Sequence, residues 1–146
     1  MLIPPPLLLL ALIALCLGAQ ALWLGGFTVS PARDVLGALI LLASVALFIS
    51  CGRLFRKAGT PFRPTSPATA IVREGPYRFS RNPMYLGMAG LLAGLGVLLG
   101  GVSFAAAVVV FLGVVHFGVV LPEERYLESL LGETYRQYKR QVRQWV

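Results

Sequence analysis

Charged residues are scarce in this sequence. Only 13% of its 146 residues are Asp, Glu, Lys or Arg, whereas 57% are hydrophobic, and the mean hydropathy is +0.76. A soluble domain ordinarily carries about 25% charged residues and fewer apolar ones. The lack of charge therefore excludes an ordinary soluble domain and predicts an integral membrane protein.

Cysteine and histidine are almost missing as well. The chain has two cysteines and one histidine. Cys16 lies in the middle of the first apolar stretch and Cys51 at the end of the second, so their depths in a bilayer would differ by about half its thickness. Because a disulfide or a shared metal ion needs the two side chains close together, the sequence predicts neither.

Long charge-free stretches are present instead. A helix needs about 20 mostly apolar residues to cross the roughly 30 Å hydrocarbon layer. Four stretches approach this length, at residues 7–24, 35–51, 84–99 and 104–121. The first lacks the basic leader of a signal peptide, so we expect it to be a retained helix. The sequence thus predicts an all-α membrane protein of one domain, 1–146, with four transmembrane helices in two hairpins, 1–52 and 83–121.

Positive charge gathers at one end of these helices. Of the 13 Lys and Arg residues, seven lie between the second and third stretches, five follow the fourth, and Arg33 stands alone on the other side. Short loops rich in Lys and Arg stay in the cytoplasm, so both termini should be cytoplasmic. For a small protein of bacterial type, this means the inner membrane. The net charge of +7 is explained by topology and by attraction to anionic lipids, so we expect no nucleic-acid partner.

Two polar segments flank the second hairpin. Residues 53–82 contain four prolines and are too many for a simple connector. We expect a cytoplasmic loop whose second half, 70–80, is ordered, partly extended and packed against the helix ends. In the tail, 122–146, apolar residues recur every three or four positions, which predicts an amphipathic helix on the membrane surface, broken or bent at Gly132.

The second hairpin should bring opposite charges together. Its two stretches have nearly equal lengths and a tight turn, so Arg78, Arg81 and Asn82 should stand level with Glu123 and Glu124. Asn82 is a good N-cap, and a proline follows it at the first helical position. The free N–H groups of such a helix start and the arginines would bind an anion. The glutamates would bind a cation.

At this point the sequence resembles a known family. The segments GPYRFSRNPMYLG, residues 75–87, and LPEERYLESLLGETYRQYKRQVRQW, residues 121–145, are similar to isoprenylcysteine carboxyl methyltransferase-like and phospholipid methyltransferase proteins. The similarity covers roughly residues 60–146. The family pattern Arg-His-Pro-x-Tyr-x-Gly corresponds to Arg81, Asn82, Pro83, Tyr85 and Gly87, with Asn82 in place of the histidine. The Glu-Glu pair, the Gly-x-x-Tyr and the Gly-x-Gly of the family correspond to Glu123 and Glu124, Gly132 and Tyr135, and Gly94 and Gly96.

The resemblance implies an S-adenosylmethionine-dependent methyltransferase with no metal. The methyl donor would lie between the last two membrane helices, under the tail, and a lipophilic acceptor would reach it from the bilayer. The implied catalytic residues are Arg81, Glu123 and Glu124. The residues implied in cofactor binding are Arg78, Asn82, Tyr85, Gly87, Gly94, Gly96, His116, Glu123, Glu124 and Tyr135. The acceptor group, whether carboxylate, amine or thiol, stays open.

Other interpretations of the same residues are also open. Arg78 and Arg81 fit simple charge anchors, Gly87, Gly90 and Gly94 fit a helix-packing face, and His116 fits either a base or a hydrogen-bonded residue of the bundle. A small four-helix transporter would ordinarily need an ionisable group within a span, and none of the four stretches contains Asp, Glu, Lys or Arg. A non-catalytic assembly subunit would not need a charge-balanced helix end.

Overall fold

The computed structural model describes residues 4–22, 30–59 and 73–146, and within them every regular element is helical. One isolated parallel β-bridge joins Ser80 to Arg143. The all-α prediction is confirmed. The helices are α1 (Pro5–Leu22), α2 (Pro31–Lys57), a 3₁₀ turn (Gly75–Arg78), α3 (Pro83–Leu99), α4 (Val102–Val115), a π-helical turn (His116–Val120), α5 (Leu121–Leu131) and α6 (Glu133–Gln141).

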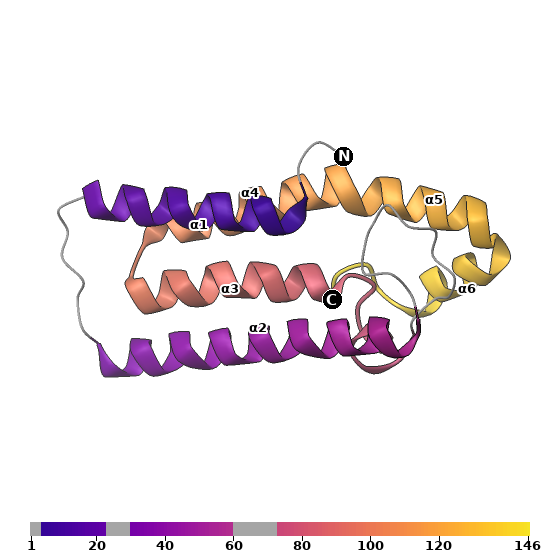
Figure 1. Ribbon diagram of the computed structural model, residues 1–146, viewed down its shortest axis with the longest axis horizontal. Helices are drawn as coiled ribbons and strands as arrows, with labels where there is room; N and C mark the ends of the chain where they lie inside the picture. Colours follow the sequence, from indigo (N-terminus) through magenta and orange to yellow (C-terminus); the bar gives the residue numbers. More distant parts are fainter. Residues whose placement is uncertain (1–3, 23–29, 60–72) are drawn as a thin grey trace.

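Helix α3 is the centre of the bundle. Helix α2 packs along one side of α3, α4 packs along another, and α1 packs on α4 and α3 (Figure 1). The first two helices therefore do not pack on each other as the N-terminal hairpin that we expected, because α3 lies between them. Hydropathy could not reveal this arrangement, since it marks apolar helices without saying which faces meet.

Glycines on α3 allow α2 to approach closely. A Cβ atom added at Gly90 would collide with Ser44 Oγ, and one added at Gly94 would lie 2.8 Å from Leu41 Cγ. At Gly87 it would lie 3.2 Å from the Ser44 carbonyl oxygen. Small residues at this spacing let two helix backbones come together in a bilayer. The helix-packing interpretation of these three glycines is confirmed.

The outside of the bundle is apolar, as a lipid-facing surface should be. Large side chains such as Leu15 on α1, Leu42 on α2 and Val109 on α4 are exposed, whereas Leu92, Phe104 and Phe111 are fully buried. Helices α1 and α2 and the continuous helix 102–131 are long and apolar enough to cross a membrane. Helix α3 has 17 residues and a length of roughly 25 Å. The fold is that of an integral membrane protein, and the count of four spans stays a prediction.

The fourth helix does not end where the sequence suggested. Helices α4 and α5 and the π-helical turn between them form one continuous helix, Val102–Leu131, that runs past Pro122. A proline lacks the N–H that would bond to the preceding turn. The wider π-helical turn directly before Pro122 accommodates this loss. Gly132, with φ +52°, ends α5. Helix α6 then turns back (Figure 1), so the expected bend is confirmed, but the single surface helix is replaced by two helices.

The polar segment before α3 is ordered where the structure describes it. Helix α2 continues to Lys57, so the segment starts later than expected. The Tyr77 ring lies edge-on to Phe55 of α2 with 5.6 Å between ring centroids, and Lys57 Nζ lies 3.4 Å from Glu74 Oε2. Residues 75–78 of the piece expected to be partly extended form a 3₁₀ turn instead, and Ser80 makes a single β-bridge to Arg143 of the tail. Residues 23–24 of the first predicted span and 60–72 of the predicted loop lie outside the described residues.

The close approach of α2 and α3 predicts a large difference between two identical substitutions. In Gly37→Ala the new Cβ would lie 2.8 Å from the backbone nitrogen of Leu98, which cannot move aside, whereas Gly113 has open space. We expect Gly37→Ala to lower the free energy of unfolding by about 1–3 kcal/mol. Gly113→Ala should be neutral or raise it by up to about 1 kcal/mol. Thermal unfolding in detergent, followed by circular dichroism, measures both, and equal melting temperatures would contradict the packing described.

Candidate functional site

A buried ion pair joins the start of α3 to α5. Arg81 Nη1 lies 2.8 Å from Glu124 Oε1, and the two side chains are only 11% and 12% exposed. Arg81 comes just before Pro83, the first residue of α3, and Glu124 is in the first turn of α5. Because α3 and α4 are antiparallel and α5 continues α4, these two positions fall at the same end of the bundle. The structure thus brings together the opposite charges that the sequence placed at this level.

Each partner of the pair keeps some unused hydrogen-bonding capacity. Arg81 Nε is buried and has no hydrogen-bond partner within residues 4–22, 30–59 and 73–146. Glu124 Oε1 accepts a hydrogen bond from Gln144 Nε2 at 3.2 Å. Its second oxygen, Oε2, is 3.8 Å from Lys139 Nζ. Within the part of the chain that the structure describes, Arg81 Nε thus has no partner, and the nearest cation to Glu124 Oε2 is Lys139, beyond hydrogen-bonding distance.

The neighbouring carboxylate has a different partner. Glu123 accepts a hydrogen bond from the hydroxyl of Tyr85, which is buried on α3. Glu124 faces cations, whereas Glu123 faces a neutral donor. Two adjacent glutamates thus have two distinct environments, and both contact residues at the start of α3.

Two tyrosines of α6 cover the pair. Arg81 donates a hydrogen bond to the Tyr135 hydroxyl, and the Tyr138 hydroxyl donates to the Tyr77 carbonyl oxygen at 2.9 Å. Burial raises the pKa of Tyr135 to about 12, the Glu124 carboxylate adds to the rise, and Arg81 opposes it. Burial likewise raises the pKa of Tyr138 to about 12. Both phenols are protonated at neutral pH, so they position neighbours and are not bases.

His116 is held by an aromatic partner. Trp145 Nε1 donates to His116 Nδ1 at 3.4 Å, and the Phe117 ring lies edge-on with 4.8 Å between centroids. With Nδ1 accepting, the neutral imidazole carries its own proton on Nε2. The histidine therefore offers an N–H in this arrangement and not a free lone pair. The structure shows the hydrogen-bonded alternative, at the first residue of a π-helical turn.

Asn82 has a role that its position did not predict. It does occupy the N-cap position before Pro83, but its side chain makes no capping hydrogen bond. Instead Asn82 Nδ2 donates to the Gln144 carbonyl oxygen at 3.0 Å. The C-terminus therefore lies beside the start of α3 (Figure 1). Sequence reasoning missed Gln144 and Lys139, and no local signal marks either, because their partners are distant along the chain.

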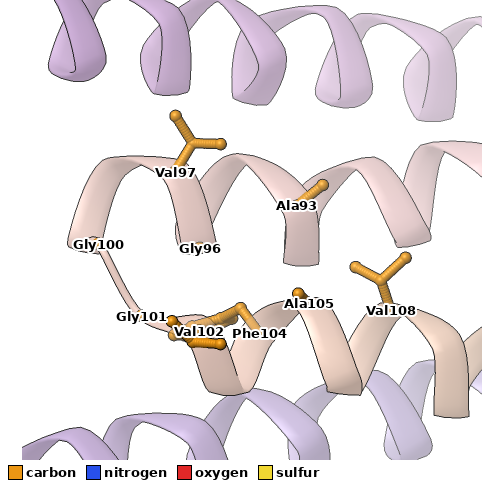
Figure 2. A pocket seen from close by; sticks show the side chains of 9 residues that line it. All are labelled: Ala93, Gly96, Val97, Gly100, Gly101, Val102, Phe104, Ala105 and Val108. Atoms are coloured by element: carbon orange, nitrogen blue, oxygen red, sulfur yellow. The ribbon is translucent and has the colours of Figure 1, made fainter.

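Several expected site residues lie elsewhere. Arg78 is exposed and belongs to no ion pair within the part of the chain that the structure describes. Gly87 packs on α2. Gly94 and Gly96 are roughly 16–20 Å along α3 from its start. Gly96 lines an apolar groove of about 480 Å³ at the far end of α3 and α4, which Figure 2 shows. Its walls are Ala93, Gly96, Val97, Phe104, Ala105, Val108 and the turn 100–102. The structure does not bring these glycines to the ion pair.

Fold and site together define a helical membrane protein with a buried arginine–glutamate pair at one end of its bundle. A family model described as phospholipid methyltransferase matches residues 13–134, and the chain belongs to this family. The match confirms the resemblance seen in the sequence and extends it over most of α1 and all of α2. It stops before residues 135–146, which include the residues of the tail that contact the site.

A relative is known as well. The chain is 36% identical over 63 residues to an uncharacterized protein of Haemophilus influenzae, an alignment that covers 43% of this chain and 100% of the relative. No solved structure matches the chain.

The burial of the ion pair predicts energetic coupling between its members. Removing one partner of a buried pair leaves the other charge unpaired, which is costly. In a double-mutant cycle with Arg81→Met and Glu124→Gln, we expect a coupling of about 2 kcal/mol in the free energy of unfolding. Denaturation of the purified protein in detergent measures it.

A second pair provides the control. Lys57 and Glu74 are 75% and 70% exposed, so a cycle with Lys57→Met and Glu74→Gln should give less than about 1 kcal/mol. Similar coupling in the two cycles would mean that the Arg81–Glu124 pair is hydrated in the folded protein.

Proposed function

We propose that this chain is an S-adenosylmethionine-dependent methyltransferase that passes a methyl group to a lipophilic acceptor in the bilayer. Membership of the phospholipid methyltransferase family supports the reaction class. The observation on which the proposal depends most is the buried ion pair between Arg81 and Glu124 at one end of the bundle. A membrane helix bundle that needs only to be stable can bury apolar residues there at lower cost.

The residues present fit the charged end of S-adenosylmethionine. Its amino-acid part carries a carboxylate and an ammonium group. The buried Nε–H of Arg81, without a partner among the described residues, suits the carboxylate, because charge-assisted hydrogen bonds are the strong ones. Glu124 Oε2, which has Lys139 only at 3.8 Å, suits the ammonium group or a ribose hydroxyl.

When bound, S-adenosylmethionine would supply an electrophilic methyl group on a positively charged sulfur. The protein would then orient the methyl donor and the acceptor and exclude water, because an in-line displacement depends on the alignment of the two reactants. Arg81 would hold the carboxylate, Glu124 and Glu123 the amino or hydroxyl groups, and Tyr135 would close the site from α6. Tyr85 and His116 would line it.

The assignment of a base depends on the acceptor. A carboxylate or a thiolate needs none, whereas an amine must first lose a proton. His116 could take that proton only after its Nδ1 is released from Trp145. The acceptor therefore stays open among lipophilic carboxylates, amines and thiols. The exposed Arg78 is suited to an anionic group of such an acceptor. We keep Gly94 and Gly96 as a weaker proposal for contact with bound molecules, because they are far from the pair.

The membrane placement follows from the same charges. We propose four spans with both termini in the cytoplasm of a bacterial cell, because the Lys and Arg residues gather at the end of the bundle that carries Arg81. The site would then face the cytoplasm. The acceptor would reach it sideways between the helices, and membrane lipids would cover the apolar exterior.

Two other functions remain as alternatives. A transporter is disfavoured because the charges of the site lie at a helix end, and α1, α3 and α4 carry no Asp, Glu, Lys or Arg. A non-catalytic membrane subunit would bind no methyl donor, so a binding measurement separates it from the enzyme.

Binding of S-adenosylmethionine tests the proposal directly. We expect saturable heat in a calorimetric titration of the purified protein in detergent. Glu124→Gln should weaken binding about tenfold or more, because it removes a charge-assisted hydrogen bond. Arg81→Lys should also weaken it, because an ammonium lacks the guanidinium fork. The control is Arg125→Ala, next to Glu124 but exposed, which should bind as the unchanged protein does.

Transfer is measured on the same samples. With a radioactive methyl donor and bacterial lipid extract, label should move into the organic phase for the unchanged protein and Arg125→Ala, and much less for Glu124→Gln. A monodisperse, helical protein that takes up no S-adenosylmethionine would overturn the enzyme assignment.

A further inference from the structure

Three consecutive residues near the C-terminus each contact a different group of the candidate site. The Arg143 carbonyl oxygen accepts a hydrogen bond from the Arg81 backbone N–H at 2.9 Å. Gln144 Nε2 donates to Glu124 Oε1 at 3.2 Å. Trp145 Nε1 donates to His116 Nδ1 at 3.4 Å. This segment, 143–145, lies outside the residues that the family model matches.

The backbone of Gln144 is fixed by the residues before α3. Its carbonyl oxygen accepts hydrogen bonds from Asn82 Nδ2 at 3.0 Å and from Ser80 Oγ at 3.4 Å. On the preceding side, the parallel bridge joins Arg143 to Ser80. With its main chain held on both sides, Gln144 directs its side chain at Glu124 from a fixed base.

The amide of Gln144 determines which oxygen of Glu124 is free. Arg81 Nη1 and Gln144 Nε2 both engage Oε1, at 2.8 and 3.2 Å. The other oxygen, Oε2, has Lys139 Nζ at 3.8 Å, beyond hydrogen-bonding distance. An ion-pair contact from Arg81 and a hydrogen bond from Gln144 on the same oxygen hold the carboxylate in one rotation and leave Oε2 for a further donor.

We propose that Gln144 is a positioning residue for Glu124: by holding Oε1 against Arg81, it presents Oε2 to the ammonium or hydroxyl group of the methyl donor. The proposal rests on the proposed function, whose ligand it uses. A glutamine suits this role because its amide donates without a charge. A glutamate at 144 would repel Glu124 and compete for Arg81, and an asparagine would be one methylene shorter.

Replacing the glutamine by methionine isolates the hydrogen bond. Gln144→Met keeps a flexible side chain of similar length but removes the N–H donor. We expect the Kd for S-adenosylmethionine, measured by calorimetry, and its KM in methyl transfer each to rise about five- to tenfold, since a hydrogen bond to a charged group is lost. The kcat should change less than about twofold, because the proposed role is in holding the donor, and the melting temperature should fall only slightly, because a single hydrogen bond to the buried pair is lost. Gln141→Met, at an exposed glutamine of the same tail, is the matched control and should leave all four quantities unchanged.

A double-mutant cycle shows whether Gln144 acts through Glu124. In a Glu124→Gln background, Gln144→Met should weaken binding by less than about twofold further, because the group that it positions is gone. Equal losses in the two backgrounds would overturn the proposal. So would a Gln144→Met protein that binds like the control, or one whose kcat and melting temperature fall while KM is unchanged, which is the behaviour of a purely structural residue. A lack of binding by the unchanged protein would instead overturn the proposed function, and this inference with it.

Discussion

The structure depends on the burial of one guanidinium and one carboxylate at the end of an apolar bundle. Removing two charges from water is expensive, and the mutual attraction compensates only when the geometry is good and the remaining donors and acceptors are used. The chain meets this condition with residues from three places: Arg81 before α3, Glu124 in α5, and Gln144 in the tail. Further ion pairs connect the site to solvent, because Lys139 contacts Glu128 at 3.2 Å and Glu128 contacts Arg136 at 3.0 Å. The charge pair is thus the buried end of a network that becomes exposed along α5 and α6.

The position of α3 links packing to the site. Its glycines allow α2 to approach on one face, and its first turn carries the buried Pro83 and Tyr85 beneath the ion pair. A helix surrounded by α1, α2 and α4 has little freedom to tilt or rotate. Its start is therefore a rigid support, which a site needs if its charges are to stay in place without rearranging when a ligand binds. The more mobile part of such a design would be the cover, α6, which joins the bundle through Gly132 and a few polar contacts.

The features that the sequence predicted correctly depend on short-range rules. The apolar stretches follow from hydropathy, the bend at Gly132 from glycine in a periodic segment, and the meeting of Arg81 with Glu124 from two equal helices joined by a tight turn. The failures concern contacts between distant segments. Nothing in α1 or α2 says that α3 will separate them, and Pro122 is a normal place to end a helix unless a π-helical turn precedes it. Asn82 has the expected position, but its side chain donates to the Gln144 carbonyl oxygen and does not cap the helix. This contact could be predicted only if the position of the tail were known.

Under the proposed function, a ligand would bind this site without breaking the ion pair. A guanidinium offers five N–H donors in a planar fork, and Glu124 engages Nη1, while Nε has no partner within the described residues. A carboxylate at Nε and a cation at Glu124 Oε2 would therefore add to the pair instead of replacing it. The charges are already oriented toward each other and are held by Tyr135 and Gln144. In the proposed reaction the site would therefore not have to reorganise its dipoles when the methyl group is transferred. Such preorganised dipoles stabilise a transition state better than water does, because water must reorient.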